Sequence, residues 1–369
     1  MRAAFAAVLV LLVAAPIAGA RIPGTGPVVR PEKAEPQAQT ITIAVSGDLL
    51  IHDALWKEAA AYAGGGGFDF RPMFRRIRPL VRRADLALCH VETPLMGGTP
   101  SGYPVFRTPR QLARAIRWTG WDACTTASNH SLDQGSSGVD STLHALDRNG
   151  IRHAGSARSA AEAARPVILT TRSGVKVALI AWTTITNGAT PDQPWRLNVT
   201  DSALPVLRQA RRARLAGAQV VIVNMHWGDE YRHPPTALQK RIARTLAISG
   251  LVTAVIGQHV HVIQPIRFAG GGLVLYGEGN LLSAQAEGPG MPAGTQDGVI
   301  GLLRIRVPAE GEGQLERIDY MPTYVQHPGH TIIPVGVDRS RPEFVASLRR
   351  TLAVIGRGRH FGPWRSLAP

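Results

Sequence analysis

The chain has 369 residues, of which 44% are hydrophobic, and it carries 41 Lys and Arg against 26 Asp and Glu. This length suffices for one large or two modest domains with a sizeable core. The net charge of +15 is compatible with an anionic polymer or an anionic membrane as a partner. Nucleic acid is a poor candidate partner, because no basic run is interleaved with the aromatic side chains that base stacking requires.

The N-terminus has the pattern of an export signal. Met1-Arg2 precedes an apolar stretch that ends in small residues, which predicts a secretory signal peptide over 1–20 with cleavage after Ala20. The alternative is an uncleaved N-terminal segment that anchors the protein to a membrane. Residues 21–40 are rich in Pro and polar residues and predict a disordered linker. We therefore expect an exported protein that is extracellular or associated with the cell envelope.

From Ile41 onward, apolar runs of strand type alternate with helical patterns. We expect strands at 41–46, 85–91, 122–128, 219–225, 251–256, 298–307 and 315–325, hairpins over 165–183 and 261–277, and helices at 54–62, 70–84, 109–120, 139–150, 201–217, 236–249 and 342–354. Alternating βα units combined with hairpins predict an α/β sandwich of two sheets with helices outside. We assign the main domain to 41–330 and a C-terminal helix and tail to 331–369.

Polar residues that can bind a metal follow most of the predicted strands. They are Asp48 with His52, His90 with Glu92, Asn129 with His130, His226, His259 with His261, and Asn280. Strand ends are where an α/β sheet gathers polar side chains from distant parts of the chain. A mixed set of oxygen and nitrogen ligands suits a pair of hydrolytic divalent metals better than a structural zinc, which would favour cysteines.

Each of these motifs also has an ordinary structural interpretation when it is taken alone. Asp48 can cap the next helix, Glu92 can be a solvated loop carboxylate, and Asn129 can form an Asx turn. Two His residues two positions apart, as in His259 and His261, share a face of an extended segment and also occur by chance. The occurrence of several such motifs at strand ends of one chain favours the metal site.

The two cysteines, Cys89 and Cys124, each lie near the end of a predicted strand. We expect two small buried hydrophobic side chains. A disulfide is the alternative if the two strands are neighbours, and an exported protein would permit one.

Taken in order, the motifs resemble the CapA family of bacterial capsule-synthesis, or poly-γ-glutamate biosynthesis, proteins, which is related to the calcineurin-like metallophosphoesterases. They are Gly-Asp at 47–48, His-Val-Glu at 90–92, Ser-Asn-His at 128–130, His-Trp-Gly at 226–228, Gly-Gln-His-Val-His at 257–261 and Gly-Asn at 279–280. The resemblance implies a metallophosphoesterase-like four-layer α-β-β-α sandwich with a dinuclear metal site between the sheets. The chain departs from the family at His90, where the family usually has Asn, and a full Asp-x-His first motif is missing.

By motif position, the resemblance implies metal or catalytic roles for seven residues. The expected metal ligands are Asp48, Glu92, Asn129, His226, His259 and His261; the expected catalytic residues are His130, as acid or charge stabiliser, and Asp48. Expected substrate contacts are His52, His90, Trp227, Glu230 and Asn280. The cofactors would be two divalent ions, with Mn, Fe and Zn equally compatible with imidazole and carboxylate ligands.

These expectations lead to one functional hypothesis with two alternatives. The protein would make, anchor or trim an anionic capsular polymer by metal-assisted hydrolysis or transfer, with a membrane synthase complex as a further partner. The first alternative is a non-catalytic scaffold that binds the polymer through its metals. The second alternative is a general cell-envelope phosphodiesterase that acts on a phosphoester substrate.

Overall fold

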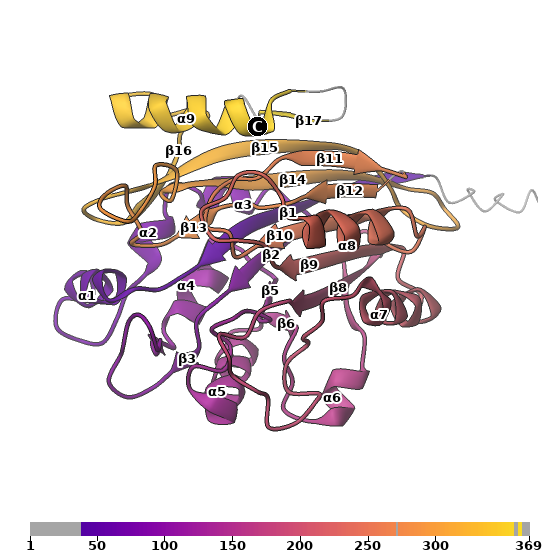
Figure 1. Ribbon diagram of the computed structural model, residues 1–369, viewed down its shortest axis with the longest axis horizontal. Helices are drawn as coiled ribbons and strands as arrows, with labels where there is room; N and C mark the ends of the chain where they lie inside the picture. The colour runs from indigo at the N-terminus through magenta and orange to yellow at the C-terminus, as the bar shows by residue number, and fades with distance from the viewer. Residues whose placement is uncertain (1–37, 271, 358–360, 364–369) are drawn as a thin grey trace, which may run out of the picture. The chain divides into compact units, whose positions relative to one another are not determined.

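The computed structural model of the chain describes residues 38–270, 272–357 and 361–363 (Figure 1). The expected signal peptide and nearly all of the expected linker lie outside the described residues. Along the described ranges, no helix is both long and apolar enough to cross a membrane.

The larger of two main sheets contains nine strands within the described residues, and we call it the large sheet. Its order is β16 (Thr331–Pro334), β15 (Gln314–Gln326), β14 (Asp297–Val307), β1 (Gln39–Leu49), β2 (Leu86–Val91), β5 (Ala123–Thr125) and β6 (Arg152–Ala154), with β13 (Asn280–Leu282) beside β1 and β17 (Phe361–Pro363) beside β15. Strands β13, β1, β2, β5 and β6 pair in parallel, whereas β14, β15 and β16 pair antiparallel. Because β16 and β17 pair with β15, part of the expected C-terminal tail belongs to this sheet.

The second main sheet, which we call the small sheet, has six strands among the described residues. Its order is β11 (Ile266–Ala269), β12 (Gly272–Leu275), β10 (Ala254–Gln258), β9 (Val220–His226), β8 (Lys176–Thr183) and β7 (Val167–Thr170). The two edges of this sheet are the expected hairpins, β7 with β8 and β11 with β12. A separate two-stranded pair joins β3 (Leu95–Met96) to β4 (Thr108–Pro109).

Helices cover the outer faces of both sheets. The helices in the described part of the chain are α1 (Asp53–Tyr62), α2 (Arg71–Phe74), α3 (Arg78–Val81), α4 (Leu112–Thr119), α5 (Gly135–Arg148), α6 (Ala160–Ala164), α7 (Ala203–Leu215), α8 (Ala237–Ala247) and α9 (Pro342–Ile355). One core cluster packs α1–α5 on the large sheet, and another packs α7 and α8 on the small sheet (Figure 1).

A third core cluster fills the space between the two sheets. It joins side chains such as Ile43 and Leu88 of the large sheet to Leu179 and Ile256 of the small sheet. Apolar faces on both sides of each sheet require a covering layer on both sides, because exposed apolar area is unfavourable in water. The fold is therefore the expected α-β-β-α sandwich.

Two expected helices differ from the sequence prediction because of proline. The expected helix over 70–84 is two short helices, α2 and α3, each with Pro at its first turn. Pro79 lacks the N–H that a continuous helix would need at that position. The expected start at Pro109 is also wrong: Pro109 lies in β4, and α4 begins at Leu112.

Candidate metal centre

The six expected metal ligands meet where parallel strands of both sheets end. Asp48 lies near the end of β1 and pairs in register with His90 of β2, while Glu92 follows β2 directly. His226 ends β9, in register with Gln258, which ends β10. Parallel strands present their carboxyl ends at one rim of a sheet, so these side chains come from distant sequence positions to one place.

The first group of candidate ligands contains Asp48, His90 and His226, all buried, with one ligand atom of each lying within 4.8 Å of the others. His90 Nε2 lies 3.8 Å from Asp48 Oδ1. His226 Nε2 lies 2.8 Å from Asn129 Oδ1, so the side-chain oxygen of Asn129 lies next to this group. This set combines carboxylate, imidazole and amide oxygen donors, which suit a divalent transition metal.

The second group contains Glu92, His259 and His261, equally buried and within the same 4.8 Å spacing. The two groups adjoin each other: His226 Nε2 is 3.9 Å from Glu92 Oε1, and His261 Nδ1 is 3.3 Å from Asp48 Oδ2. Two adjoining groups of three candidate ligands each suit a pair of cations better than a single cation.

The donor atoms of these side chains show the fit most directly. Both carboxylate oxygens of Glu92, Nε2 of His90, and Nδ1 of His226 and of His259 are buried and have no hydrogen-bond partner in the protein. Buried polar atoms are normally hydrogen-bonded, because leaving them unpaired costs about 1–3 kcal/mol each. Several such atoms in one cluster indicate a site built for a cation.

Burial keeps most of these imidazoles neutral. Burial lowers the pKa of His90 to about 4 and of His259 to about 3, and it lowers the pKa of His226 well below its usual value. The neutral imidazole is the form that binds a metal. Burial likewise raises the pKa of Glu92 well above the usual range of a glutamate.

His261 differs from the other three histidines. Burial lowers its pKa, but the carboxylate of Glu92 and a hydrogen bond with Asp48 outweigh burial and raise the pKa to about 9. The two carboxylates therefore favour positive charge at this point of the protein, as a cation site requires.

Neighbouring residues orient the candidate ligands. Thr125 Oγ1 lies 2.7 Å from His90 Nδ1, which leaves His90 Nε2 directed at Asp48. Asn280 Oδ1 lies 3.0 Å from His261 Nδ1. The backbone N–H of His259 donates to Asp48 Oδ2 at 3.1 Å. Such contacts fix ring orientation and commonly change metal affinity by about 10–100-fold when they are removed.

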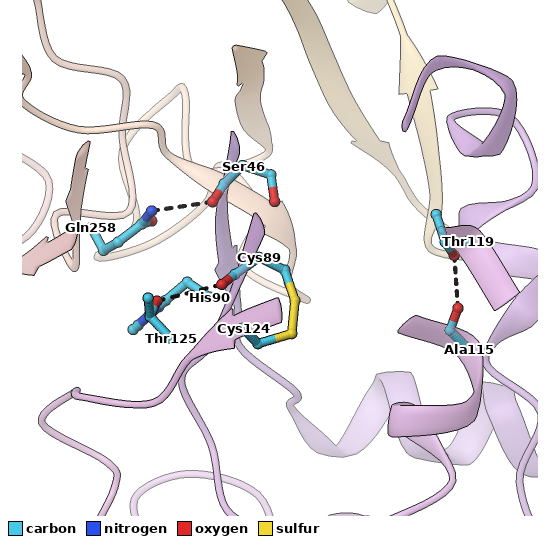
Figure 2. The surroundings of a disulfide bond; sticks show 8 residues. All are labelled: Ser46, Cys89, His90, Ala115, Thr119, Cys124, Thr125 and Gln258. Carbon is cyan, nitrogen blue, oxygen red and sulfur yellow. Dashed lines mark hydrogen bonds between the residues drawn. A yellow bond between two sulfur atoms is a disulfide. The ribbon is translucent and has the colours of Figure 1, made fainter. Parts of the chain in front are cut away.

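Cys89 and Cys124 form a disulfide between β2 and β5, one residue before His90 and Thr125 (Figure 2). The sequence favoured two free buried cysteines, but the register places Cys89 opposite Cys124 with a Cα–Cα distance of 4.4 Å, which a disulfide can bridge. The bond therefore fastens together the two strands that carry His90 and its hydrogen-bond partner.

The backbone around His259 and His261 differs from the expected extended segment. β10 ends at Gln258, and both histidines have positive φ, 89° for His259 and 54° for His261. Non-glycine residues rarely adopt this conformation, and it is concentrated at functional sites where the surrounding structure holds it in place. The two rings therefore reach the cluster from a turn. They do not share a face through the alternation of side chains along a strand, as the sequence predicted.

A cavity of about 800 Å³ opens in front of the cluster. His52, Asn129, His130, Glu230 and His261 are among its lining residues. His130 belongs to neither ligand group, and its Nδ1 lies 2.9 Å from Asp133 Oδ2, which leaves its other ring nitrogen for the cavity. The structure thus places His130 beside the candidate ligands and not among them.

Three of the five expected substrate contacts do not line this cavity. Trp227 is fully buried against the outer helices, where its Nε1 donates to the Tyr276 carbonyl. Fully buried His90 is one of the candidate metal ligands, and buried Asn280 positions His261; neither of them lines the cavity.

Sequence reasoning missed other residues of the site, namely Tyr103, Phe106, Thr125, Asp133 and Tyr231. Asp133 could have been found, because its spacing from His130 is that of neighbours on a helical turn. Tyr103 and Phe106 lie in a loop that carries no metal ligand, and no sequence signal connects that loop to the site.

The model of a family described as bacterial capsule synthesis protein PGA_cap matches residues 42–285. The chain is also similar to the capsule biosynthesis protein CapA of Bacillus anthracis, with 24% identity over 257 residues, 67% of this chain and 61% of that protein. The PGA biosynthesis protein CapA of Bacillus subtilis (strain 168) is 23% identical over 229 residues, 58% of this chain and 57% of that protein. The chain thus matches less than two thirds of the length of either relative.

Two solved structures are similar at lower levels. A phosphatase from Mycoplasma pneumoniae gives a TM-score of 0.47 with 12% identity, covering 79% of this chain and 96% of that one. The calcineurin-like phosphoesterase YfkN from Bacillus subtilis gives 0.46 with 16% identity, covering 86% and 97%. Both TM-scores lie below 0.5, so the description of the fold rests on the sheets and cores themselves.

Proposed function

The chain belongs to the bacterial capsule synthesis protein family PGA_cap, and from that premise we propose that it makes, anchors or trims an anionic capsular polymer by metal-assisted hydrolysis or transfer. The observation that supports catalysis is the convergence of Asp48, Glu92, Asn129, His226, His259 and His261, with unpaired donor atoms, at the bottom of an open cavity.

Two divalent ions in such a site would polarise the substrate and lower the pKa of a bound water. Asp48, His90 and His226 would hold one ion with the help of Asn129, and Glu92, His259 and His261 would hold the other. Asp48 also accepts the backbone N–H of His259, so the Gly-Asp motif helps to fix the turn that carries His259 and His261.

His130 supplies the proton chemistry in this proposal. Asp133 holds Nδ1 of the ring and therefore sets the tautomer in which Nε2 faces the cavity. From there His130 can assist the leaving group or the charge that develops on it, a contribution typically of about 10²–10⁴ in rate. A scaffold that only bound polymer would have no use for this histidine–aspartate pair.

We also propose that the protein is exported and works at the cell envelope, with an anionic polymer and a membrane synthase complex as partners. The support for export is the pattern of residues 1–20, in which an apolar stretch ends in Ala18-Gly19-Ala20. Fractionation of the native host, with an antibody against the protein, tests this directly, and recovery only from the cytosol would refute it.

The catalytic proposal is tested by incubating the purified protein, with and without manganese, with poly-γ-glutamate and with a generic phosphodiester. We expect manganese-dependent cleavage of the polymer and its loss in His130→Ala. Cleavage of the phosphodiester alone would favour the general phosphodiesterase. Metal-dependent polymer binding without any cleavage, unchanged in His130→Ala, would establish the scaffold instead.

A further inference from the structure

The side chains that line the cavity in front of the candidate metal centre differ in charge from those of the chain as a whole. The chain has 41 Lys and Arg, yet no Lys or Arg is present among the described residues that line this cavity. Its carboxylates are Asp133 and Glu230. Asp133 accepts from His130 and from a backbone N–H, whereas Glu230 is exposed next to Tyr231.

One wall of the cavity is apolar and projects into solvent. Tyr103 is 76% exposed and Val105 is 50% exposed, and both line the cavity. Behind them, the buried ring of Phe106 makes edge contacts with Tyr103, at 6.4 Å between ring centroids, and with His130, at 4.7 Å. An aromatic row thus leads from solvent to the proposed proton donor.

The loop that carries this wall is fixed in place. The backbones of Ser101 and Arg107 form an isolated antiparallel β-bridge, and Ser101 Oγ donates to the Val105 carbonyl at 2.7 Å. The Phe106 N–H donates to Asp133 Oδ2 at 2.8 Å. A loop held at its base presents its apolar side chains at small entropic cost, as a binding surface requires.

A polyanion lying along this cavity would place carboxylates near Asp133 and Glu230 with no Lys or Arg among the described lining residues to offset them. Like charges in such proximity are unfavourable, whereas an ammonium group beside Glu230 would be attracted. Positive charge for an anionic group would be supplied by the metals. The cavity therefore suits one anionic group at the metals and an uncharged or cationic remainder.

We propose that the substrate carries a single anionic group directed at the candidate metal centre, an aromatic or apolar body against Tyr103 and Val105, and an amine near Glu230. For an anionic polymer, this means that the site takes a chain end or a junction and not an internal run of carboxylates. The inference rests on the proposed function in one respect only: metal ions must be present at the site to bind the anionic group.

The test measures binding of four phosphonates to the full chain by calorimetry, with and without manganese. The probes are methylphosphonate, phenylphosphonate, and the para-carboxylate and para-aminomethyl derivatives of phenylphosphonate. We expect metal-dependent binding of all four, with the aminomethyl derivative tighter than phenylphosphonate and the carboxylate derivative weaker, by about 2–5-fold in each case.

Two variants assign these differences to residues. Tyr103→Ala should weaken the binding of phenylphosphonate by about 2–13-fold, as loss of an aromatic contact does. The affinity for methylphosphonate should not change. Glu230→Gln should remove the preference for the aminomethyl derivative. The matched controls, Leu204→Ala on α7 and Glu310→Gln between β14 and β15, change exposed side chains outside the cavity and should alter neither ratio.

The inference would be overturned if the carboxylate derivative bound as tightly as phenylphosphonate or more tightly. It would also be overturned if Tyr103→Ala left the ratio of the affinities for phenylphosphonate and methylphosphonate unchanged. In both cases the proposed function would still be supported as long as the phosphonates bound more tightly with manganese than without it. If none of the probes bound better with manganese than without it, the proposed function would fail, and this inference with it.

Discussion

Asp133 is the residue whose substitution separates proton chemistry from metal binding. Its side chain is 8% exposed, and Oδ2 lies 2.9 Å from His130 Nδ1 and 2.8 Å from the Phe106 nitrogen. Both contacts go to the same oxygen, so in Asp133→Asn the amide oxygen can take its place and keep them, but the negative charge is lost. A neutral acceptor stabilises a positively charged imidazole less than a carboxylate does.

The structure sets the expected size of each effect. Two hydrogen bonds to a charged acceptor become bonds to a neutral one, which should lower the free energy of unfolding by about 1–3 kcal/mol in total. Loss of the carboxylate that stabilises His130 while its ring carries the proton it donates should lower turnover by about 10²–10⁴, the range for loss of a positioned acid or base. Metal content should not change, because Asp133 belongs to neither ligand group.

The assay compares turnover, metal content and urea unfolding of wild type, Asp133→Asn and a matched control. Asp140→Asn is that control, because Asp140 lies on α5 and pairs with Arg196 at 2.8 Å without lining the cavity. Turnover of Asp133→Asn equal to that of Asp140→Asn would refute the proposed action of His130. A parallel loss of metal would show that Asp133 supports the ligands instead.

Three further predictions follow from contacts around the cluster. Thr125→Val, which removes the partner of His90 Nδ1, should weaken manganese binding by about 10–100-fold in a competition titration; unchanged affinity would contradict this assignment. Reducing the Cys89–Cys124 disulfide, which closes a 35-residue separation, should lower the free energy of unfolding by about 3–4 kcal/mol, and a Cys89→Ser variant should no longer respond to reductant. Burial raises the pKa of the Glu278 carboxyl well above its usual value, so its contribution to stability is fully present at acidic pH and is lost as pH rises through the raised pKa. Glu278→Gln, measured in chelator, should therefore lose less stability than wild type between pH 5 and neutral pH, and parallel curves would exclude this explanation.

The convergence of the candidate ligands could be predicted because their chemistry coincides with a strong pattern of secondary structure. Asp48, Glu92 and His226 each stand at or directly after the end of a buried strand, and parallel strands of a sandwich end at a common rim. The pattern of apolar runs also specified the two sheets and the layers of helices, because these depend on which faces must be buried.

The remaining features depend on contacts that a single sequence does not display. The burial of Trp227 against α8 and the placement of His90 among the ligands follow from the strand register between β9 and β10 and between β1 and β2. The disulfide likewise depends on the direct opposition of Cys89 and Cys124. Register is set by tertiary packing, and a shift of one residue would turn each of these side chains to the opposite face.

The wall of the cavity was beyond prediction for another reason. Tyr103 and Val105 belong to a loop whose position is set by hydrogen bonds to Asp133 and Gln134, which are distant in sequence. Loops carry no periodicity, so their partners cannot be inferred from spacing.

The candidate metal centre is tested most directly by the metal content of three purified proteins after manganese loading and desalting. We predict close to two ions per wild-type chain, a clear loss in His259→Ala, and full retention in His130→Ala, because only His259 belongs to a ligand group. Equal metal content in wild type and His259→Ala would contradict the metal centre itself.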